Sequence, residues 1–360
     1  MPKIIFDFVD GAAGSEGGKQ LNQTAIESIR LQPRVLVNID ESELGKNILG
    51  YDMGLPFGIA PMGMCNLTWP NADLMLADEA KHRRIPLCLS TASSTSMEDI
   101  FQRSGDMSWF QLYLNQSVEH SMQMVDRAQK AGYEVLILTV DVPKVARRIR
   151  DAKNGFEYPF KIGPKQFIDF ATHPNWSIQT LLNGTPRFAN FGTSKSPKDF
   201  SRKAGRSGAD WSFLKQLREC WKGKLIIKGV LSAEDAIEIK NAGADAIYVS
   251  NHGARQLDSA PAAIDALPRI RHAVGKDFTL IFDSGIRSGE GIVKALALGA
   301  DFVMLGRPML YAIGARGEAG LSTLFTNLSE EISLTLAQTG LRRVEDVDVN
   351  VLFQPPPELL

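Results

Sequence analysis

The sequence contains few cysteines, and none of them belongs to a familiar pattern. Cys65, Cys88 and Cys220 make an odd number, and no CxxC or CxxH pair occurs. This usage argues against a disulfide framework and against a zinc site, so no metal centre is expected. We expect reduced thiols in a cytoplasmic protein.

Long hydrophobic runs and an excess of one charge are also missing. No run reaches the ~18 consecutive apolar residues of a membrane-spanning helix, and residues 1–7 lack the apolar core of a signal peptide. The 40 Lys and Arg residues nearly balance the 41 Asp and Glu residues, which leaves a net charge of -1. With charges so balanced, the protein has no overall positive electrostatic field to attract nucleic acid, so no nucleic-acid partner is expected.

The chain instead shows a regular alternation of two kinds of segment. Its 360 residues, 44% of them hydrophobic, are enough for a substantial core. Apolar runs as uniform as Leu225-Ile226-Ile227 are typical of parallel strands that are covered on both faces. Runs of this kind predict strands at 55–60, 85–90, 108–113, 134–140, 223–228, 245–250, 278–283 and 301–305.

Helix-like stretches lie between these runs. Residues 71–84, 117–131, 232–242 and 288–298 each open on Asn or Ser, which cap helix N-termini. Glycines follow several of them just before the next strand, where helices commonly end. The alternation predicts an α/β fold, a (β/α)8 TIM barrel, with residues 1–360 forming a single domain.

Two regions depart from the alternation. Residues 1–50 are expected to form an N-terminal cap, with helical spacing over 19–30. Residues 143–209, after the fourth strand, are far longer than an ordinary loop, which predicts a functional insertion. Its first half holds the aromatic residues Phe156, Tyr158, Phe160, Phe167, Phe170 and Trp176, and its second half holds Lys195, Lys198, Arg202, Lys203 and Arg206.

The active site of such a barrel is built at the carboxyl ends of the strands. Polar residues and glycines gather at these positions. They are Pro61, Met62, Gly63, Ser90, Gln111, Tyr113, Thr139, Asp141, Lys228, Ser250, His252, Arg255, Asp283, Gly285, Arg287, Gly306 and Arg307.

The loop at 250–258 places His252 and Arg255 directly after a buried strand. An acid/base group beside an anion clamp has this layout, and the alternative is a polar loop whose histidine caps another group. Asp141 could hold one ring nitrogen of His252 so that the other acts as base, or it could be a turn residue before Pro143.

Lys228 ends an apolar strand, so its ammonium needs an anion or an electron-rich partner. It is either a Schiff-base lysine or a cation beside a cofactor that becomes negative on reduction. Arg287 and Arg307 stand beside glycines at the last two strand ends, which predicts a phosphate cradle rather than two ordinary helix starts. Arg148 and Arg255 together suit bidentate recognition of a carboxylate.

These residues carry a resemblance to a known family. The motifs Ser250–Gln256, Lys228-Gly229, Asp283-Ser284-Gly285, Gly306-Arg307, Phe110-Gln111-Leu112-Tyr113 and Thr139-Val140-Asp141 resemble those of the FMN-dependent L-2-hydroxy acid oxidases and dehydrogenases. The match runs from about residue 3 to 345. Leu89–Ser93, Pro61-Met62-Gly63 and His173–Ser177 are most similar to the mandelate and L-lactate dehydrogenase branch.

The resemblance implies oxidation of an L-2-hydroxy acid to the 2-keto acid with FMN as cofactor. His252 would be the catalytic base, oriented by Asp141, and Lys228 would stabilise the reduced flavin. Arg148, Arg255 and Tyr113 would bind the substrate. The flavin ring would contact Pro61, Met62, Gly63, Ser90, Gln111, Thr139 and Ser250, and the ribityl phosphate would contact Asp283, Gly285, Arg287, Gly306 and Arg307.

Three positions bear on substrate and acceptor. Phe8 stands where the family usually has a tyrosine that contacts the substrate carboxylate, and the lost hydrogen bond is worth about 1.5–3 kcal/mol. Ala92 replaces a bulky residue of the short-chain oxidases, which favours a mandelate-like or other bulky substrate. Gly63 favours a dehydrogenase that passes electrons to a quinone or other carrier over an oxidase that uses O2. The chain also starts without the short helix that usually precedes this segment.

The resemblance also bears on partners. In the mandelate dehydrogenase branch the insertion attaches to the membrane, so residues 160–206 are expected either to contact the inner face of the cell membrane or to form a soluble lid. Relatives are commonly homo-tetramers. Two other functions stay open: a Schiff-base aldolase or lyase that uses Lys228, and a non-catalytic FMN-binding barrel.

Overall fold

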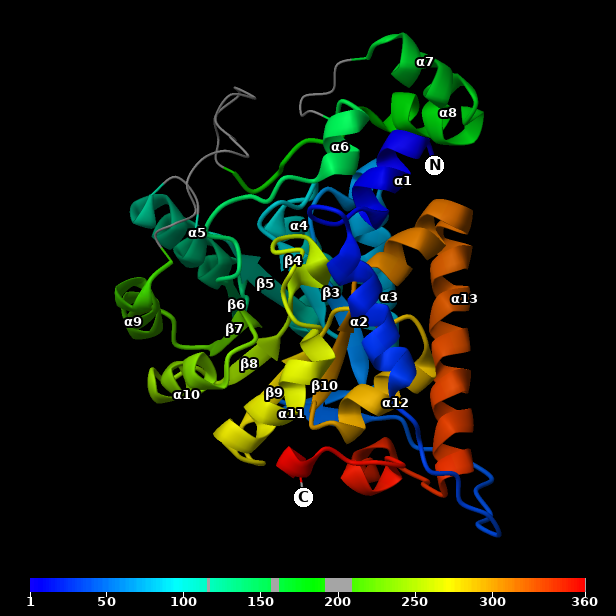
Figure 1. Ribbon diagram of the computed structural model, residues 1–360. Helices are drawn as coiled ribbons and strands as arrows, with labels where there is room; N and C mark the ends of the chain where they lie inside the picture. Colours follow the sequence, from blue (N-terminus) through cyan, green and yellow to red (C-terminus); the bar gives the residue numbers. More distant parts are fainter. Residues whose placement is uncertain (115–116, 157–161, 192–208, 360) are drawn as a thin grey trace.

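A closed barrel of eight parallel strands forms the centre of the molecule (Figure 1). The computed structural model describes residues 1–114, 117–156, 162–191 and 209–359. Around the barrel the strand order is β10-β3-β4-β5-β6-β7-β8-β9. Each strand overlaps one predicted apolar run, which confirms the predicted TIM barrel. The strands are β3 (Phe57–Met62), β4 (Leu87–Ser90), β5 (Ser108–Leu112), β6 (Val135–Thr139), β7 (Lys224–Val230), β8 (Ala246–Val249), β9 (Thr279–Phe282) and β10 (Phe302–Leu305).

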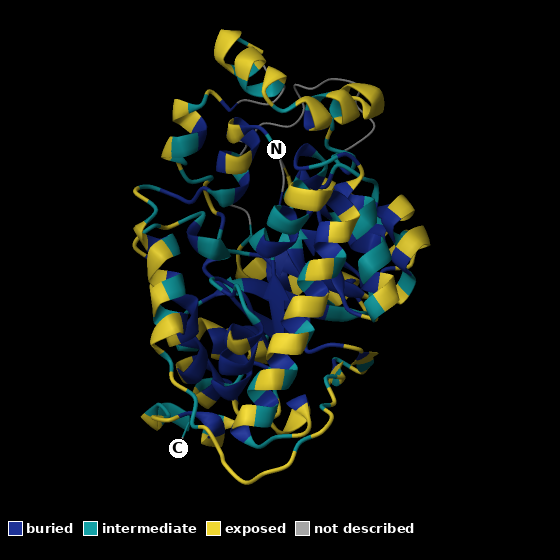
Figure 2. Ribbon diagram, turned by 90° about the vertical axis from the view of Figure 1, so that its right-hand side faces the viewer, coloured by how far each residue is buried: buried dark blue, intermediate teal, exposed yellow. Residues whose placement is uncertain are grey.

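Helices cover the outside of the barrel, so the strands are buried on both faces (Figure 2). Ser117, Ser232 and Ser288 cap their helices as predicted, because each side chain accepts a hydrogen bond from a backbone N–H in the first turn. The covering helices are α3 (Ala72–Arg83), α4 (Met97–Ser104), α5 (Val118–Ala131), α9 (Trp211–Cys220), α10 (Ala233–Asn241), α11 (Ala263–Val274), α12 (Gly289–Ala297) and α13 (Arg307–Thr339).

The prediction that the Asn71 side chain caps the N-terminus of α3 was wrong. Asn71 has a left-handed backbone with φ of 63°, and its side chain makes no capping bond. The side chain of Asn66 instead accepts the hydrogen bond of the Asp73 N–H at 2.9 Å. A preceding short 3-10 turn at Cys65–Leu67 presents Asn66 to the helix start, which local sequence pattern did not reveal.

The N-terminal region contains two helices and a hairpin. Helices α1 (Lys3–Asp10) and α2 (Gly17–Ser28) lie near the carboxyl ends of the strands, and α2 corresponds to the helical spacing seen at 19–30. Paired side-chain amides of Asn22 and Asn251 join α2 to the loop after β8 at 2.9 and 2.7 Å. Strands β1 (Lys46–Ile48) and β2 (Tyr51–Met53) form a hairpin whose apolar side chains pack with the barrel interior.

The insertion contributes helices α6 (Ile149–Lys153), α7 (Pro164–Ala171) and α8 (Pro174–Asn183). The backbone N–H groups of Lys3 and Ile4 donate to the Asp169 carboxylate of α7 at 2.9 and 3.1 Å, which ties α1 to the insertion. Within the described ranges no helix is long and apolar enough to cross a membrane. Tyr158, Phe160 and the basic residues Lys195, Lys198, Arg202, Lys203 and Arg206 lie outside the described residues.

Candidate active site

A cavity opens at the carboxyl ends of the strands. Most of the predicted site residues line it. They are Phe8, Pro61, Met62, Gly63, Ser90, Tyr113, Arg148, Lys228, His252, Arg255, Asp283, Gly285, Arg287, Gly306 and Arg307.

The remaining predicted site residues stand one contact behind this lining. Ser90 donates its hydroxyl to Gln111 Oε1 at 3.0 Å, and Gln111 Nε2 donates to Thr139 Oγ1 at 2.9 Å. This buried chain of side chains crosses three neighbouring strands and fixes the orientation of the amide. Asp141 contacts His252, and Ser250 contacts Lys228. Every predicted site residue is therefore brought to the same end of the barrel.

His252 forms the centre of an acid/base arrangement. Its Nδ1 lies 2.9 Å from Asp141 Oδ1, and its Nε2 lies 3.2 Å from the Tyr113 hydroxyl. Burial, together with the nearby cations Lys228 and Arg148, lowers the pKa of His252 although Asp141 acts in the opposite direction. Burial acts to raise the pKa of Asp141, but His252 and Lys228 outweigh it and lower that pKa. The pair therefore presents a neutral imidazole held by an ionised carboxylate.

The backbone around His252 is strained. Both His252 and Ala254 have a φ of 59°, a left-handed conformation that non-glycine residues rarely adopt. The Ser284 hydroxyl accepts hydrogen bonds from the N–H groups of Asn251 and Gly253 at 3.3 and 3.0 Å and donates to Asp283 Oδ1 at 2.8 Å. Sequence reasoning did not single out Ser284, although its place between Asp283 and Gly285 was a signal.

Lys228 is buried and has two polar partners. Its ammonium donates to Ser250 Oγ at 2.7 Å and lies 3.2 Å from Asp283 Oδ2. Burial acts to lower the pKa of Lys228, but the nearby carboxylates of Asp283 and Asp141 outweigh it, so the pKa is raised. The lysine is thus held as a cation, which is the protonation state that a Schiff-base nucleophile must lose.

Two pairs of arginines approach the cavity. Arg287 and Arg307, which follow the last two strands, both line it, and burial, with the mutual repulsion of the two guanidinium groups, lowers the pKa of Arg307. Two partly buried cations beside one cavity require an anion. Arg148 and Arg255 line the part that also contains His252, and Arg148 Nη1 lies 3.7 Å from Asp151 Oδ2.

An apolar wall completes the cavity; it consists of Phe8, Met64, Leu67, Phe156 and Phe188, of which sequence reasoning had assigned only Phe8 to the site. The rings of Phe8 and Phe156 stack with their centroids 4.4 Å apart and their planes at 7°. Phe188, Met64 and Leu67 also line the cavity. Phe156 and Phe188 both come from the insertion. Sequence reasoning noted Phe156 only as one of several aromatic residues and did not single out Phe188, because contacts across such distances in sequence require the folded chain.

Comparison with known proteins decides the family. A family model described as FMN-dependent dehydrogenase matches residues 1–354. The chain belongs to the FMN-dependent dehydrogenase family. The barrel is therefore that of a flavin-dependent dehydrogenase, and its cofactor is FMN.

Individual relatives agree with this placement. The dehydrogenase is 39% identical to (S)-mandelate dehydrogenase of Pseudomonas putida over 94% of this chain and 87% of the relative. It is 35% identical to L-lactate dehydrogenase of Pseudomonas syringae pv. syringae (strain B728a) over 98% and 95%. The crystal structure of the monotopic membrane protein (S)-mandelate dehydrogenase superposes with a TM-score of 0.94 at 38% identity, covering 99% of this chain and 96% of that one.

The dehydrogenase oxidises L-2-hydroxy acids, and its cavity fits FMN. Arg287 and Arg307 offer guanidinium groups suited to a phosphate, and the buried hydroxyl and amide groups on β4, β5 and β6 offer donors and acceptors suited to a polar ring edge. Lys228 supplies a buried positive charge to the same cavity. The two curated relatives differ in substrate, so the family alone does not choose between lactate and mandelate.

Proposed function

We propose that the dehydrogenase prefers L-2-hydroxy acids with an aryl or other bulky apolar group, as in mandelate. The observation that carries this proposal is the stacked pair Phe8–Phe156 on the cavity wall. A small residue, Ala92, also lines the cavity, and its Cβ would be only 3.0 Å from a Cβ added at Gly63. Aromatic walls and small residues together favour a flat apolar group, because offset or edge-on ring contacts add to its burial.

In this proposal His252 is the catalytic base. FMN, when bound, supplies the oxidising group that accepts the electron pair. Nε2 of His252 takes a proton from the substrate, and Asp141 stabilises the imidazolium that forms while it fixes the ring orientation. The Tyr113 hydroxyl, 3.2 Å from Nε2, would contact the substrate oxygen beside the base.

Arg148 and Arg255 would hold the substrate carboxylate, since both line the cavity near His252. Phe8 offers no hydroxyl there, and Arg255 instead lies over its ring with Cζ 5.6 Å from the centroid. The carboxylate therefore depends on two guanidinium groups and Tyr113, while Phe8 contributes apolar surface to the rest of the substrate.

Groups on successive strand ends would hold the cofactor. Lys228 would place its charge where the reduced flavin becomes negative. The flavin ring would lie against the backbone after β3 and against the polar side chains of β4–β6 and β8, namely Pro61, Met62, Gly63, Ser90, Gln111, Thr139 and Ser250. Asp283, Gly285, Arg287, Gly306 and Arg307 would hold the ribityl chain and phosphate.

Substrate preference tests the proposal directly. We expect kcat/KM for L-mandelate to exceed that for L-lactate about tenfold or more in a dye-reduction assay, because burying a phenyl-sized group is worth about 1.5–3 kcal/mol. Replacing Phe156 with alanine is expected to remove most of this difference. With O2 as the only acceptor, turnover should be much slower than with the dye.

Phe101→Ala is the matched control, since Phe101 packs on Tyr133 away from the cavity with a centroid distance of 5.2 Å. It should lower stability, as large-to-small changes do, without altering the substrate ratio. Higher kcat/KM for lactate than for mandelate in the unaltered enzyme would refute the proposed preference.

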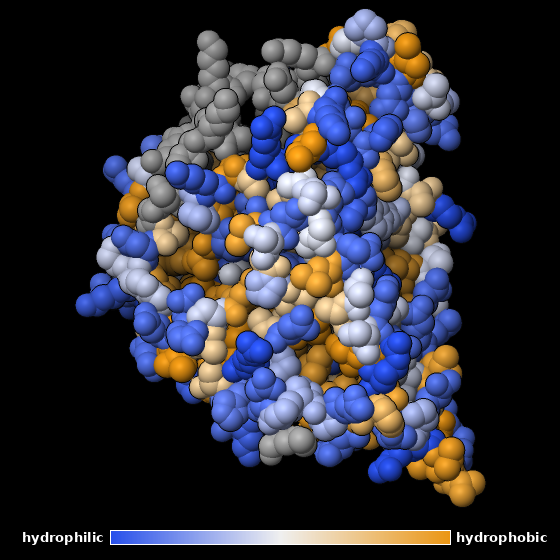
Figure 3. Space-filling view, viewed as in Figure 1, coloured by the Kyte–Doolittle hydropathy of each residue, from blue (hydrophilic) through white to orange (hydrophobic). Residues whose placement is uncertain are grey.

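We also propose that α7 and α8 contact a membrane, from which a quinone takes the electrons. Large apolar side chains on and beside these helices are exposed: Ile162, Phe167, Ile168, Ile178, Leu181 and Leu182. Figure 3 shows apolar surface among polar residues at this end of the molecule. Clustered exposed apolar residues mark interaction sites, and a short amphipathic helix lies in a membrane interface without spanning it.

Vesicle binding tests this surface. Replacing Phe167, Ile168, Leu181 and Leu182 with serine is expected to reduce cosedimentation with anionic phospholipid vesicles at least about tenfold, since the buried apolar area drives interfacial binding. Serine at Val35 and Leu36, an exposed apolar pair on another loop, is the control and should not change binding. If both variants and the unaltered protein sediment equally with the vesicles, α7 and α8 do not form the membrane-binding surface.

A further inference from the structure

We propose that Arg150 is a positioning residue that holds α1 in place and thereby orients both Arg255 and Arg307. The inference rests on the roles proposed for these two arginines at the substrate carboxylate and the FMN phosphate. Arg150 itself lies on α6 in the insertion and does not line the cavity. Its effect would pass through the end of α1.

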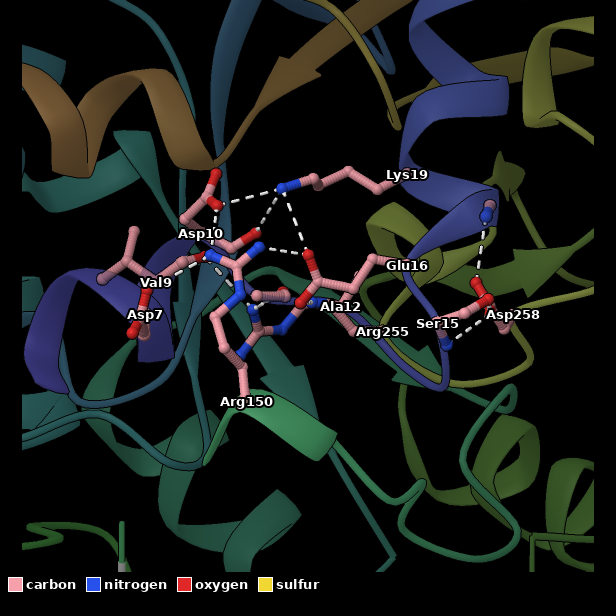
Figure 4. Close-up of polar contacts among 12 residues, drawn as sticks. Asp7, Val9, Asp10, Ala12, Ser15, Glu16, Lys19, Arg150, Arg255 and Asp258 are labelled. Atoms are coloured by element: carbon pink, nitrogen blue, oxygen red, sulfur yellow. Dashed lines mark hydrogen bonds and ion pairs between the residues drawn. The ribbon is translucent and has the colours of Figure 1, made fainter. Parts of the chain in front are cut away.

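Arg150 is the centre of a cluster of three carboxylates (Figure 4). Its Nη1 lies 2.6 Å from Asp10 Oδ2 and 3.3 Å from Asp7 Oδ1, and its Nη2 donates to Glu16. Burial acts to lower the pKa of Arg150, but the Asp10 and Glu16 carboxylates outweigh it and raise that pKa. One guanidinium therefore joins α6 to both ends of the α1–α2 connection.

Further contacts complete the cluster. Lys19 lies 2.9 Å from Asp10, the Tyr311 hydroxyl donates to Asp10 at 2.7 Å, and Asn154 donates to Asp7 at 2.7 Å. Burial acts to raise the pKa of Asp10, but Tyr311, Lys19 and Arg150 outweigh it and lower that pKa. Asp10 is thus ionised at neutral pH, and removing Arg150 would leave it and the neighbouring acidic side chains crowded together without a compensating guanidinium.

The carbonyl groups at the end of α1 are what this cluster positions. A helix leaves its last carbonyls without intrahelical partners, and its C-terminal end attracts cations. Here guanidinium groups fill that role. Arg255 donates to the carbonyls of Phe8, Val9 and Gly11 at 3.0, 3.1 and 2.7 Å.

Arg307 uses two of the same acceptors. It donates to the carbonyls of Val9 and Gly11 at 3.2 and 2.8 Å, and to Gly253 in the loop of His252 at 3.0 Å. The carbonyls of Val9 and Gly11 are therefore shared between Arg255 and Arg307. A shift of α1 would move both guanidinium groups together, whereas the contacts of His252 with Asp141 and Tyr113 do not involve α1.

The experiment compares two affinities in Arg150→Met. We expect the Kd of the apoprotein for FMN, followed by flavin fluorescence, and the Kd of the holoenzyme for oxalate, followed by the flavin spectrum, each to rise about tenfold or more. At saturating FMN, KM should rise with kcat changed by no more than about twofold, because the base and its partner stay in place. Arg150→Lys should recover part of both affinities, since it keeps the charge without the fork.

Arg218→Met is the matched control. Arg218 is 23% exposed against 29% for Arg150, and it pairs with Asp245 at 2.9 Å before β8, at the opposite end of the barrel from the cavity. It should leave both Kd values unchanged. If Arg150→Met does not fold, Glu16→Gln tests the same cluster with a smaller rise in both constants, because its amide oxygen still accepts a hydrogen bond.

The variant Arg255→Met distinguishes a failure of the proposed carboxylate site from a failure of the positioning role of Arg150. If this variant leaves the oxalate Kd unchanged, the proposed carboxylate site is wrong. If it weakens oxalate binding while Arg150→Met and Glu16→Gln bind oxalate and FMN like the unaltered enzyme, the positioning role of Arg150 is wrong. A loss of only one of the two affinities also contradicts shared positioning through α1.

Discussion

Replacing His252 with glutamine is expected to lower kcat/KM by about 10²–10⁴-fold, the usual contribution of a positioned general base. Glutamine keeps a polar group of similar size but cannot take up a proton at neutral pH. His252 is the only imidazole among the described residues that line the cavity, so no neighbour can replace it. FMN should remain bound, because the proposed cofactor contacts lie on other side chains. Steady-state dye reduction and the flavin spectrum of the purified variant check both expectations.

The role of His252 as base also predicts how the activity of the unaltered enzyme depends on pH. The base must be neutral, so kcat/KM should fall as pH drops through the pKa of His252. Burial lowers that pKa from its usual 6.5, so the acid limb should lie below pH 6.5. His272→Gln, at an exposed helix position, should keep the activity and the profile. Full activity in His252→Gln would remove the histidine from the mechanism.

Replacing Lys228 with methionine is expected to slow substrate-dependent flavin reduction by about 10²–10³-fold, as the loss of a preorganised charge at an active site does. The lysine ammonium lies 3.2 Å from Asp283, so the variant would leave a carboxylate facing the flavin region without its cation. The lost ammonium and the uncompensated Asp283 carboxylate both disfavour the negative charge that the flavin gains on reduction. Stopped-flow reduction and the midpoint potential of the bound flavin are the measurements, and the potential should become more negative.

Lys294→Met provides the control for removal of a buried lysine. The Lys294 side chain is 6% exposed against 4% for Lys228, and it pairs with Glu290 at 2.6 Å on α12. It should lower stability without altering the flavin potential. Lys228→Arg should keep part of the rate, because the charge remains. An unchanged potential in Lys228→Met would contradict the role proposed for this residue.

Local sequence pattern was sufficient for the barrel because each of its signals is local. Strands such as β7 are buried on both faces and therefore read as continuous apolar runs. Ser117 and Ser288 indicate where their helices begin, because each hydroxyl accepts a hydrogen bond from a backbone N–H a few residues later. The strand ends then placed His252, Lys228 and Arg307 in one region, because parallel strands of a barrel all end on the same side.

Features that depend on distant contacts were not predictable in this way. Helix α1 is eight residues long and depends on packing, since Asp169 and Arg150 hold it from the insertion. Phe156 joins the cavity wall only because the chain returns to stack it on Phe8, far away in sequence. The predicted cap at Asn71 failed for a local reason, since its backbone is left-handed and its side chain makes no capping hydrogen bond.

The tether between α1 and α7 has a practical consequence for protein production. The N–H groups of Lys3 and Ile4 are both bound to Asp169, so the first residues are held against the insertion at the same end of the molecule as the cavity mouth. An affinity tag fused ahead of Met1 would crowd this junction and the exposed surface of α7 and α8. The other terminus lies at the opposite end of the molecule, so a tag after the short turn Pro357–Leu359 leaves both undisturbed.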